Sequence, residues 1–226
     1  MTTTPTKKKV GRPRKVAQVP KLMLVSVLLD STGSMESCKP QTIEGLNNYV
    51  QSLRGNKDAI IQFSLTLFNS ANIEHRYVNT SLDKVSPLTN ENYIPREYTP
   101  LYDAIGRSIR KMEEDISNHT PAPSVLMIFQ TDGQENSSTE FSQKTIFKMI
   151  EDKKQAGWTF IFLGADIDAY SVSAVLGISA GNTMSYISSD TSKLYKTLSS
   201  ATTIYAGMSS TDSTTEFFAP EKRNKE

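Results

Sequence analysis

The stretch LMLVSVLLDSTGS, residues 22–34, joins an apolar run to a polar turn. Its first eight residues are apolar except for Ser26, and their length and β-branched content suit a strand buried on both faces. The strand ends at Asp30, which opens a turn of small polar residues. Two later stretches, SVLMIFQTD at 124–132 and WTFIFLGAD at 158–166, repeat the pattern of a buried strand that ends in Asp.

Helical patterns separate these strands. Apolar residues at three- and four-residue spacing predict amphipathic helices at 43–53, 101–116, 141–157, 168–177 and 190–206. Further strands are expected at 59–68, 73–78 and 183–187, and the charge of 73–78 favours a sheet edge. A long polar connection is expected from Asn79 to Tyr98. This order predicts an α/β fold with a mostly parallel sheet and helices on both faces.

The 226 residues suffice for one domain with tails. Residues 1–20 are expected to form a disordered basic arm, 21–207 the domain and 208–226 a flexible tail, in which docking of Phe217 and Phe218 stays open. Residues 1–21 hold seven basic side chains and no acid, and the remainder holds 18 basic and 24 acidic side chains. Such asymmetry suggests an interaction tail.

Cysteine content and hydropathy favour a cytoplasmic protein. The single cysteine, Cys38, forms no internal disulfide and is expected to be a small buried residue. The N-terminus is polar where a signal peptide needs an apolar run, and no stretch approaches the roughly 18 apolar residues of a membrane span. We therefore expect no membrane association.

Oxygen-bearing side chains follow the strands at the predicted carboxyl edge of the sheet, where ligands bind in such folds. Asp30, Thr32 and Ser34 alternate along an extended turn, so that their side chains can converge. Thr99 precedes a helix and Asp132 ends a central strand, and both complete an oxygen shell suited to Mg²⁺. The alternative is an ordinary turn of helix-capping residues.

These motifs, Asp-x-Thr-x-Ser at 30–34, TPLYDA at 99–104 and TDG at 131–133, resemble the metal-ion-dependent adhesion site of a von Willebrand factor A domain. The likeness spans about residues 22–180 and is greatest for the intracellular domains of bacteria and phages. It implies a three-layer Rossmann-like fold with one antiparallel edge strand, Mg²⁺ or Mn²⁺ at the five residues, and capture of a partner's Asp or Glu. The chain departs from the family at Thr32, where Ser is usual, and at Tyr98, where Gly is common.

The segment VGRPRK within the arm resembles an AT-hook, which lies in the minor groove of A·T-rich DNA. The resemblance assigns nucleic-acid contacts to Lys9, Gly11, Arg12, Pro13, Arg14 and Lys15. The alternative is a solvated basic tail that adheres to any polyanion.

Other motifs argue against enzymatic classes. GISAG at 177–181 matches the nucleophile elbow of hydrolases, but it follows a predicted helix rather than a strand and no His lies downstream. No glycine-rich nucleotide-binding loop occurs. The sequence therefore predicts a non-enzymatic, metal-dependent protein-binding module of a bacterial or phage-infected cell. The alternatives are a DNA-associated protein and an assembly adaptor.

Overall fold

A computed structural model describes residues 21–117, 119–188, 191–208 and 213–218. The basic arm at 1–20, with its AT-hook-like segment, lies outside these residues. No helix in the described ranges is long and apolar enough to cross a bilayer.

The elements alternate as the sequence predicts. The strands are β1 (Lys21–Asp30), β2 (Ala59–Asn69), β3 (Asn72–Ser81), β4 (Ser124–Thr131), β5 (Thr159–Ala165) and β6 (Thr183–Tyr186). The α-helices are α1 (Lys39–Arg54), α2 (Leu101–Ile116), α3 (Gln143–Gln155), α4 (Ala169–Val175) and α5 (Ser192–Gly207). Short 3-10 helices cover Gly33–Cys38, Leu82–Lys84 and Ala180–Asn182.

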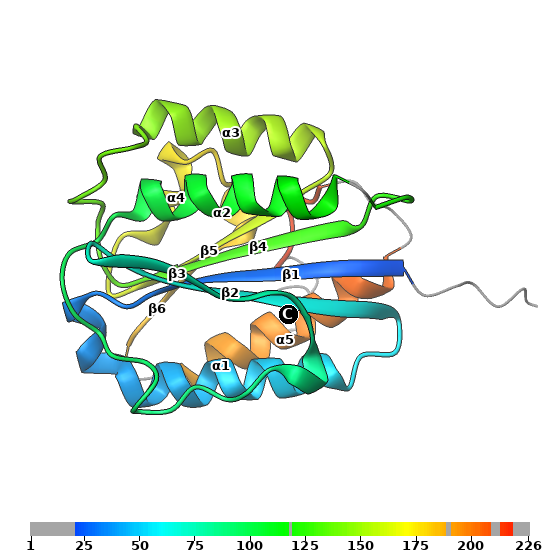
Figure 1. Cartoon of the computed structure of the whole chain (residues 1–226), viewed down its shortest axis with the longest axis horizontal. Coiled ribbons are helices and arrows are strands. Elements are labelled where there is room, and N and C mark those ends of the chain that lie inside the picture. The colour runs from blue at the N-terminus through cyan, green and yellow to red at the C-terminus, as the bar shows by residue number, and fades with distance from the viewer. Residues whose placement is uncertain (1–20, 118, 189–190, 209–212, 219–226) are drawn as a thin grey trace, which may run out of the picture.

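The six strands form one sheet in the order β3-β2-β1-β4-β5-β6 (Figure 1). All neighbouring pairs are parallel except β2 and β3, which confirms the antiparallel edge strand. The carboxyl ends of β1, β2, β4, β5 and β6 therefore meet at one edge, on the left in Figure 1. Loops from distant parts of the sequence gather there.

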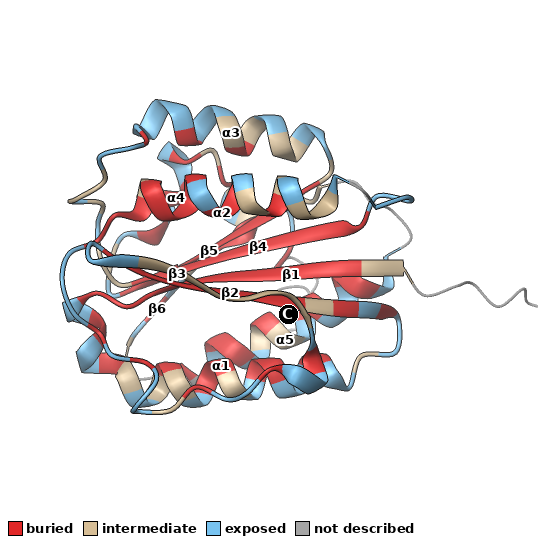
Figure 2. Cartoon of the chain, in the orientation of Figure 1, coloured by how far each residue is buried: buried red, intermediate tan, exposed pale blue. Residues whose placement is uncertain are grey.

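Helices cover both faces of the sheet in three layers, as expected. In Figure 1, α2, α3 and α4 lie above the sheet and α1 and α5 lie below it. Alternate residues of β1 supply both cores: Val25 and Val27 face α1 and α5, whereas Leu24 and Leu28 face α2 and α3. The buried colouring of the central strands in Figure 2 reflects this two-sided burial.

The connection from β3 to α2 contributes apolar residues to the core, although the sequence predicts a polar connection. Leu82, Val85, Leu88 and Tyr93 are buried in the core below the sheet. Their spacing follows neither the helix nor the strand period, so periodicity does not reveal that they are buried. The buried residues fix the path of a chain segment that leads to Thr99.

The described part of the C-terminal segment packs against the sheet, which differs from the flexible tail expected at 208–226. Phe217 and Phe218 are buried in the lower core. The Phe217 N–H donates to Asn182 Oδ1 at 2.9 Å, and the Asn182 side chain donates to the Thr214 carbonyl at 2.6 Å. Two aromatic side chains and a buried amide therefore hold residues 213–218 to the domain.

Candidate metal centre

The loop after β1 folds back on the carboxylate that opens it. The Thr32 N–H donates to Asp30 Oδ1 at 2.7 Å, which turns the chain directly after the strand. The Thr32 and Ser34 hydroxyl oxygens lie 3.3 Å apart. Alternation along the loop thus brings Asp30, Thr32 and Ser34 to one side, as the sequence predicts.

The loop after β4 joins this group, because β4 is the direct parallel neighbour of β1. The Ser34 hydroxyl donates to Asp132 Oδ1 at 2.7 Å. One residue earlier, the Thr131 hydroxyl donates to Asp30 Oδ2 at 2.5 Å. Both loops are therefore bonded to each other through side chains at the sheet edge.

Thr99, in the connection from β3 to α2, lies beside the loops that follow β1 and β4. A Cβ atom added to Gly133 would lie 3.0 Å from Thr99 Oγ1, so the Thr99 hydroxyl lies against the residue that follows Asp132. The Gly33 N–H also donates to the Glu97 carbonyl at 3.1 Å. The five predicted metal ligands thus come from three loops that contact one another.

Two residues of the loop after β4, whose role no sequence pattern reveals, hold the start of α2 and Thr99 in position. The Thr99 N–H donates to Asn136 Oδ1 at 2.8 Å, and the Asn136 N–H donates to the Thr99 carbonyl at 3.1 Å. The Glu135 carboxylate accepts hydrogen bonds from the backbone N–H groups of Tyr102, Ser137 and Ser138. These contacts join irregular loops, which carry no periodic signal in the sequence.

Asp103 has a similar role. Its carboxylate accepts hydrogen bonds from the backbone N–H groups of Thr139, Glu140 and Phe141, with N···O distances of 2.9 to 3.0 Å. These partners lie 36 to 38 residues away in the sequence, so Asp103 is more than a local helix cap. Asp103 therefore fastens the loop after β4 to the start of α2 instead of binding the metal.

The two carboxylates lie in a setting that disfavours their negative charge. Burial raises the pKa of Asp30 to about 6, while hydrogen bonds from Thr131 and Thr32 act in the opposite direction and the charge of Asp132 adds to the rise. Burial also raises the pKa of Asp132, against the hydrogen bond from Ser34. Among the described residues neither carboxylate has an ion-pair partner.

The donor set fits a hard divalent cation. It consists of two carboxylates and three hydroxyls, which are oxygen ligands of the kind that Mg²⁺ and Mn²⁺ prefer. The described ranges hold no cluster of three or more His, Cys, Asp or Glu side chains that suits a metal ion. A soft-metal site of sulfur and imidazole ligands is therefore not what these residues offer.

Other residues singled out in the sequence have structural roles. Cys38 is buried, as expected, and Trp158, directly before β5, is also buried. Asp168 caps α4 by accepting the Ser171 N–H at 3.1 Å. Ser179 of the GISAG motif follows α4 and donates to the Thr215 carbonyl at 2.7 Å, so it serves the C-terminal segment and does not sit on a strand-to-helix elbow.

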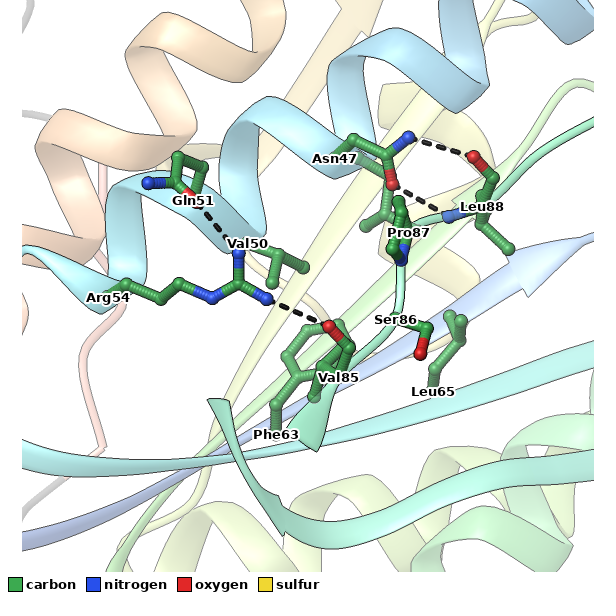
Figure 3. A pocket seen from close by; sticks show the side chains of 11 residues that line it. Asn47, Val50, Gln51, Arg54, Phe63, Leu65, Val85, Ser86, Pro87 and Leu88 are labelled. Carbon is green, nitrogen blue, oxygen red and sulfur yellow. Dashed lines mark hydrogen bonds between the residues drawn. The ribbon is translucent and has the colours of Figure 1, made fainter. Parts of the chain in front are cut away.

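A separate pocket of about 180 Å³ lies between α1 and residues 85–88 (Figure 3). Asn47 donates to the Leu88 carbonyl and accepts the Leu88 N–H, and Arg54 donates to the carbonyls of Leu82 and Val85. Figure 3 shows these polar groups directed at the connection. They hold the chain that leads to Thr99, so the pocket has a structural explanation.

Comparison with solved structures places the chain in the von Willebrand factor A fold. The vWF domain of the type V pili tip protein Mfa5 from Porphyromonas gingivalis superposes with a TM-score of 0.61 and 9% identity, over 86% of this chain and 99% of that one. Proximal thread matrix protein 1 from the mussel byssus, with a zinc-occupied MIDAS motif, gives 0.56 and 15%, over 78% and 47%. The pilus adhesin SpaC from Lactobacillus rhamnosus GG gives 0.55 and 14%, over 83% and 30%.

At sequence identities of 9 to 15%, the similarity shows the fold alone. The chain spans about half the length of the mussel protein, and nearly all of the Mfa5 domain. The sequence matches no model of a protein family and no curated protein. These neighbours are pilus and byssus proteins, so they give no support to the intracellular type that the sequence resembles.

Proposed function

We propose that the chain is a non-enzymatic protein-binding module that captures an acidic residue of a partner through a Mg²⁺ or Mn²⁺ ion. The observation that carries this proposal is the hydrogen bond from Ser34 to Asp132, which joins the loops after β1 and β4. It gathers hydroxyls and carboxylates at the edge of the sheet where ligands bind in α/β folds.

The five candidate ligands would contribute two kinds of oxygen atom. Asp30 and Asp132 supply negative charge, and Thr32, Ser34 and Thr99 supply neutral oxygens; these five side chains would hold the ion. A divalent ion with few charged protein ligands keeps an open coordination position that accepts a carboxylate oxygen. The mussel protein, which has a similar fold, holds zinc in a MIDAS motif, and this supports metal binding by the chain.

The same residues argue against hydrolysis. Metal-assisted hydrolysis needs a positioned base or a second metal near the first. His75 lies on the edge strand β3, hydrogen-bonded to Thr66, and His119 lies beyond the end of α2. The proposed activity is therefore adhesion, and absence of catalysis stays part of the proposal.

Affinity capture tests the function. The full-length chain is used as bait in a lysate of the organism that encodes it, in Mg²⁺ and in EDTA. The Asp132→Asn variant keeps an acceptor for Ser34 but removes one charge from the centre, and Asp58→Asn is the matched control at an exposed position in the loop between α1 and β2.

The proposal predicts that a partner is retained by the wild type and by Asp58→Asn in Mg²⁺. The same partner is lost in EDTA and with Asp132→Asn. Retention of the same proteins under all conditions would refute metal-dependent adhesion.

Binding of A·T-rich DNA by the arm stays a second prediction, since residues 1–20 lie outside the described structure. Lys21 begins β1 and Asp30 ends it, so the described chain resumes after the arm at the opposite end of the strand from the candidate metal centre. Phosphate contacts by the arm would weaken steeply with salt and vanish on removal of residues 1–20, whereas metal-dependent adhesion would respond to chelator.

A further inference from the structure

The surface that surrounds the candidate metal centre is acidic. We define the metal-site face as residues 33–37, 94–98, 132–134, 166–170 and 187–188, which follow the strands or contact the loops that do. Its charged side chains are five carboxylates and one guanidinium: Glu36, Glu97, Asp132, Asp166, Asp168 and Arg96. The face is therefore negative beyond the two carboxylates assigned to the metal.

Contacts between the loops bring these charges together. The Gly33 N–H donates to the Glu97 carbonyl, and the Ser188 N–H lies 3.3 Å from both carboxylate oxygens of Asp166. Glu36, Glu97, Asp166 and Asp168 are exposed. None of the four forms an ion pair with another residue in the part of the chain that the structure describes. Their charge is thus available to a partner.

Apolar side chains are exposed on the same face. Tyr98 and Ile187 are each 67% exposed and Ile94 is 57% exposed, which makes them the three most exposed large apolar residues of the described chain. Tyr170, at the start of α4, adds a fourth. Exposed apolar groups scattered singly need no explanation, but their concentration around one site is typical of an interaction surface.

These features restrict the chemistry of the partner. A bound divalent ion can accept one carboxylate, but further acidic groups on the partner would be repelled by Glu36, Glu97, Asp166 and Asp168. Basic and apolar side chains would instead meet complementary groups. We propose that the metal-site face recognises a protein segment in which a single Asp or Glu is flanked by Lys or Arg and by large apolar residues.

This inference rests on the proposed function and specifies its partner. The chain's own basic arm does not meet the description, because residues 1–21 contain seven basic side chains and no Asp or Glu to offer to a metal. We assign the face to a segment of another protein.

Synthetic peptides test the inference with the full-length chain. The first nonapeptide carries one central Asp flanked by Lys and Leu, the second has Glu in place of each Lys, and the third is the first with Asn in place of Asp. Binding is measured by fluorescence anisotropy in Mg²⁺ and in EDTA at physiological ionic strength, where the Debye length is about 8 Å.

We expect the first peptide to bind in Mg²⁺ at least about tenfold more tightly than the second, and to lose binding in EDTA and with Asn at its centre. The double variant Glu97→Gln, Asp166→Asn should reduce that preference to about threefold or less. Asn tolerates the left-handed conformation of Asp166, where φ is 53°. Ile187→Ser should weaken binding, while Ile60→Ser, 55% exposed on β2, should not.

The outcomes separate the inference from the proposed function. Metal-dependent binding of the first two peptides with equal affinity would overturn the inference and leave the function standing. Binding of the first peptide that survives both EDTA and the Asn replacement would overturn the function itself. Failure of the first peptide to bind in Mg²⁺ would also overturn the inference.

Discussion

The Ser34 hydroxyl donates to the Asp132 carboxylate across 2.7 Å, although the two residues are 98 positions apart in the sequence. Parallel pairing of β1 and β4 makes this contact possible, because it brings the residues that follow each strand to the same edge. The geometry of the candidate metal centre therefore depends on sheet register as much as on the loops themselves. Each element that fixes these loops can be tested separately.

Removal of the buried charge at Asp30 should have opposite effects with and without metal. Asp30 is fully buried and has no ion-pair partner among the described residues, so its charge is unfavourable in the metal-free protein. We expect Asp30→Asn to raise the free energy of unfolding in EDTA by on the order of 1 kcal/mol.

In Mg²⁺ at about 100 times its dissociation constant, the wild type should gain about 2.7 kcal/mol and Asp30→Asn should gain nothing. Urea denaturation of both proteins in the two buffers measures the difference. Equal gains on addition of Mg²⁺ would show that Asp30 is not a ligand.

Asn136 is predicted to position Thr99 without touching the metal. Asn136→Ala removes the acceptor of the Thr99 N–H and should lower Mg²⁺ affinity by about tenfold or more. Asn136→Asp, which keeps that acceptor, should restore the affinity. The control is Asn56→Ala, which removes the acceptor of the Asp58 and Ala59 N–H groups. These groups lie at the start of β2, away from the candidate metal centre, so Mg²⁺ affinity should stay unchanged. Calorimetric titration distinguishes these outcomes.

Asp103 should matter more for stability than a local cap would. Replacement by Ala leaves three backbone N–H groups of residues 139–141 without their acceptor in a largely buried place, which should cost about 3 kcal/mol of unfolding free energy. Asp168→Ala, at the exposed cap of α4, should cost clearly less. Equal losses for the two variants would mean that Asp103 acts only as a cap.

His75 should make stability depend on pH. Burial lowers its pKa below the usual 6.5, and the charges of Lys111 and Arg107 also lower it, whereas Asp115 raises it. Between this lowered value and 6.5 the unfolded chain binds more protons than the folded chain, so stability falls as the pH drops below 6.5.

His75→Gln should reduce that loss relative to wild type when unfolding is followed from pH 7.5 to about 5.5. His119→Gln, at an exposed position, is the control. An unchanged slope in His75→Gln would contradict the prediction.

The C-terminal segment should contribute to the stability of the domain. Phe217→Ala removes a ring packed against Tyr205 and Phe218 and should cost about 3 to 5 kcal/mol. Phe147→Ala, at an exposed position on α3, is the matched control and should cost clearly less. Thermal unfolding of the two proteins compares them. A Phe217→Ala protein as stable as wild type would restore the expectation of a flexible tail.

The sequence predicts the sheet well because its strands are long apolar runs. β1, β4 and β5 are buried on both faces, and the more polar β3 lies at the edge, so hydropathy alone separates central from edge positions. The stripe of α5 through Leu194, Leu198, Ala201 and Tyr205 is likewise buried as its spacing predicts.

The remaining features depend on contacts between irregular segments. Asn136, Glu135 and Asp103 act by accepting backbone N–H groups of distant loops, which no spacing in the sequence reveals. The docking of Phe217 depends on Asn182, a residue 35 positions earlier. The convergence of the five candidate ligands could be predicted because each ends or follows a strand or precedes a helix, whereas the residues that position them could not.

Titration with Mn²⁺, with bound and free ions distinguished by electron paramagnetic resonance, shows whether the five side chains bind a divalent ion. The full-length wild type is compared with Asp132→Asn, which keeps the size of the side chain and an acceptor for Ser34. We expect one bound ion per wild-type chain, displaced by Mg²⁺, and at least about tenfold weaker binding in the variant. Equal Mn²⁺ binding by both proteins, or none by the wild type, would contradict this expectation.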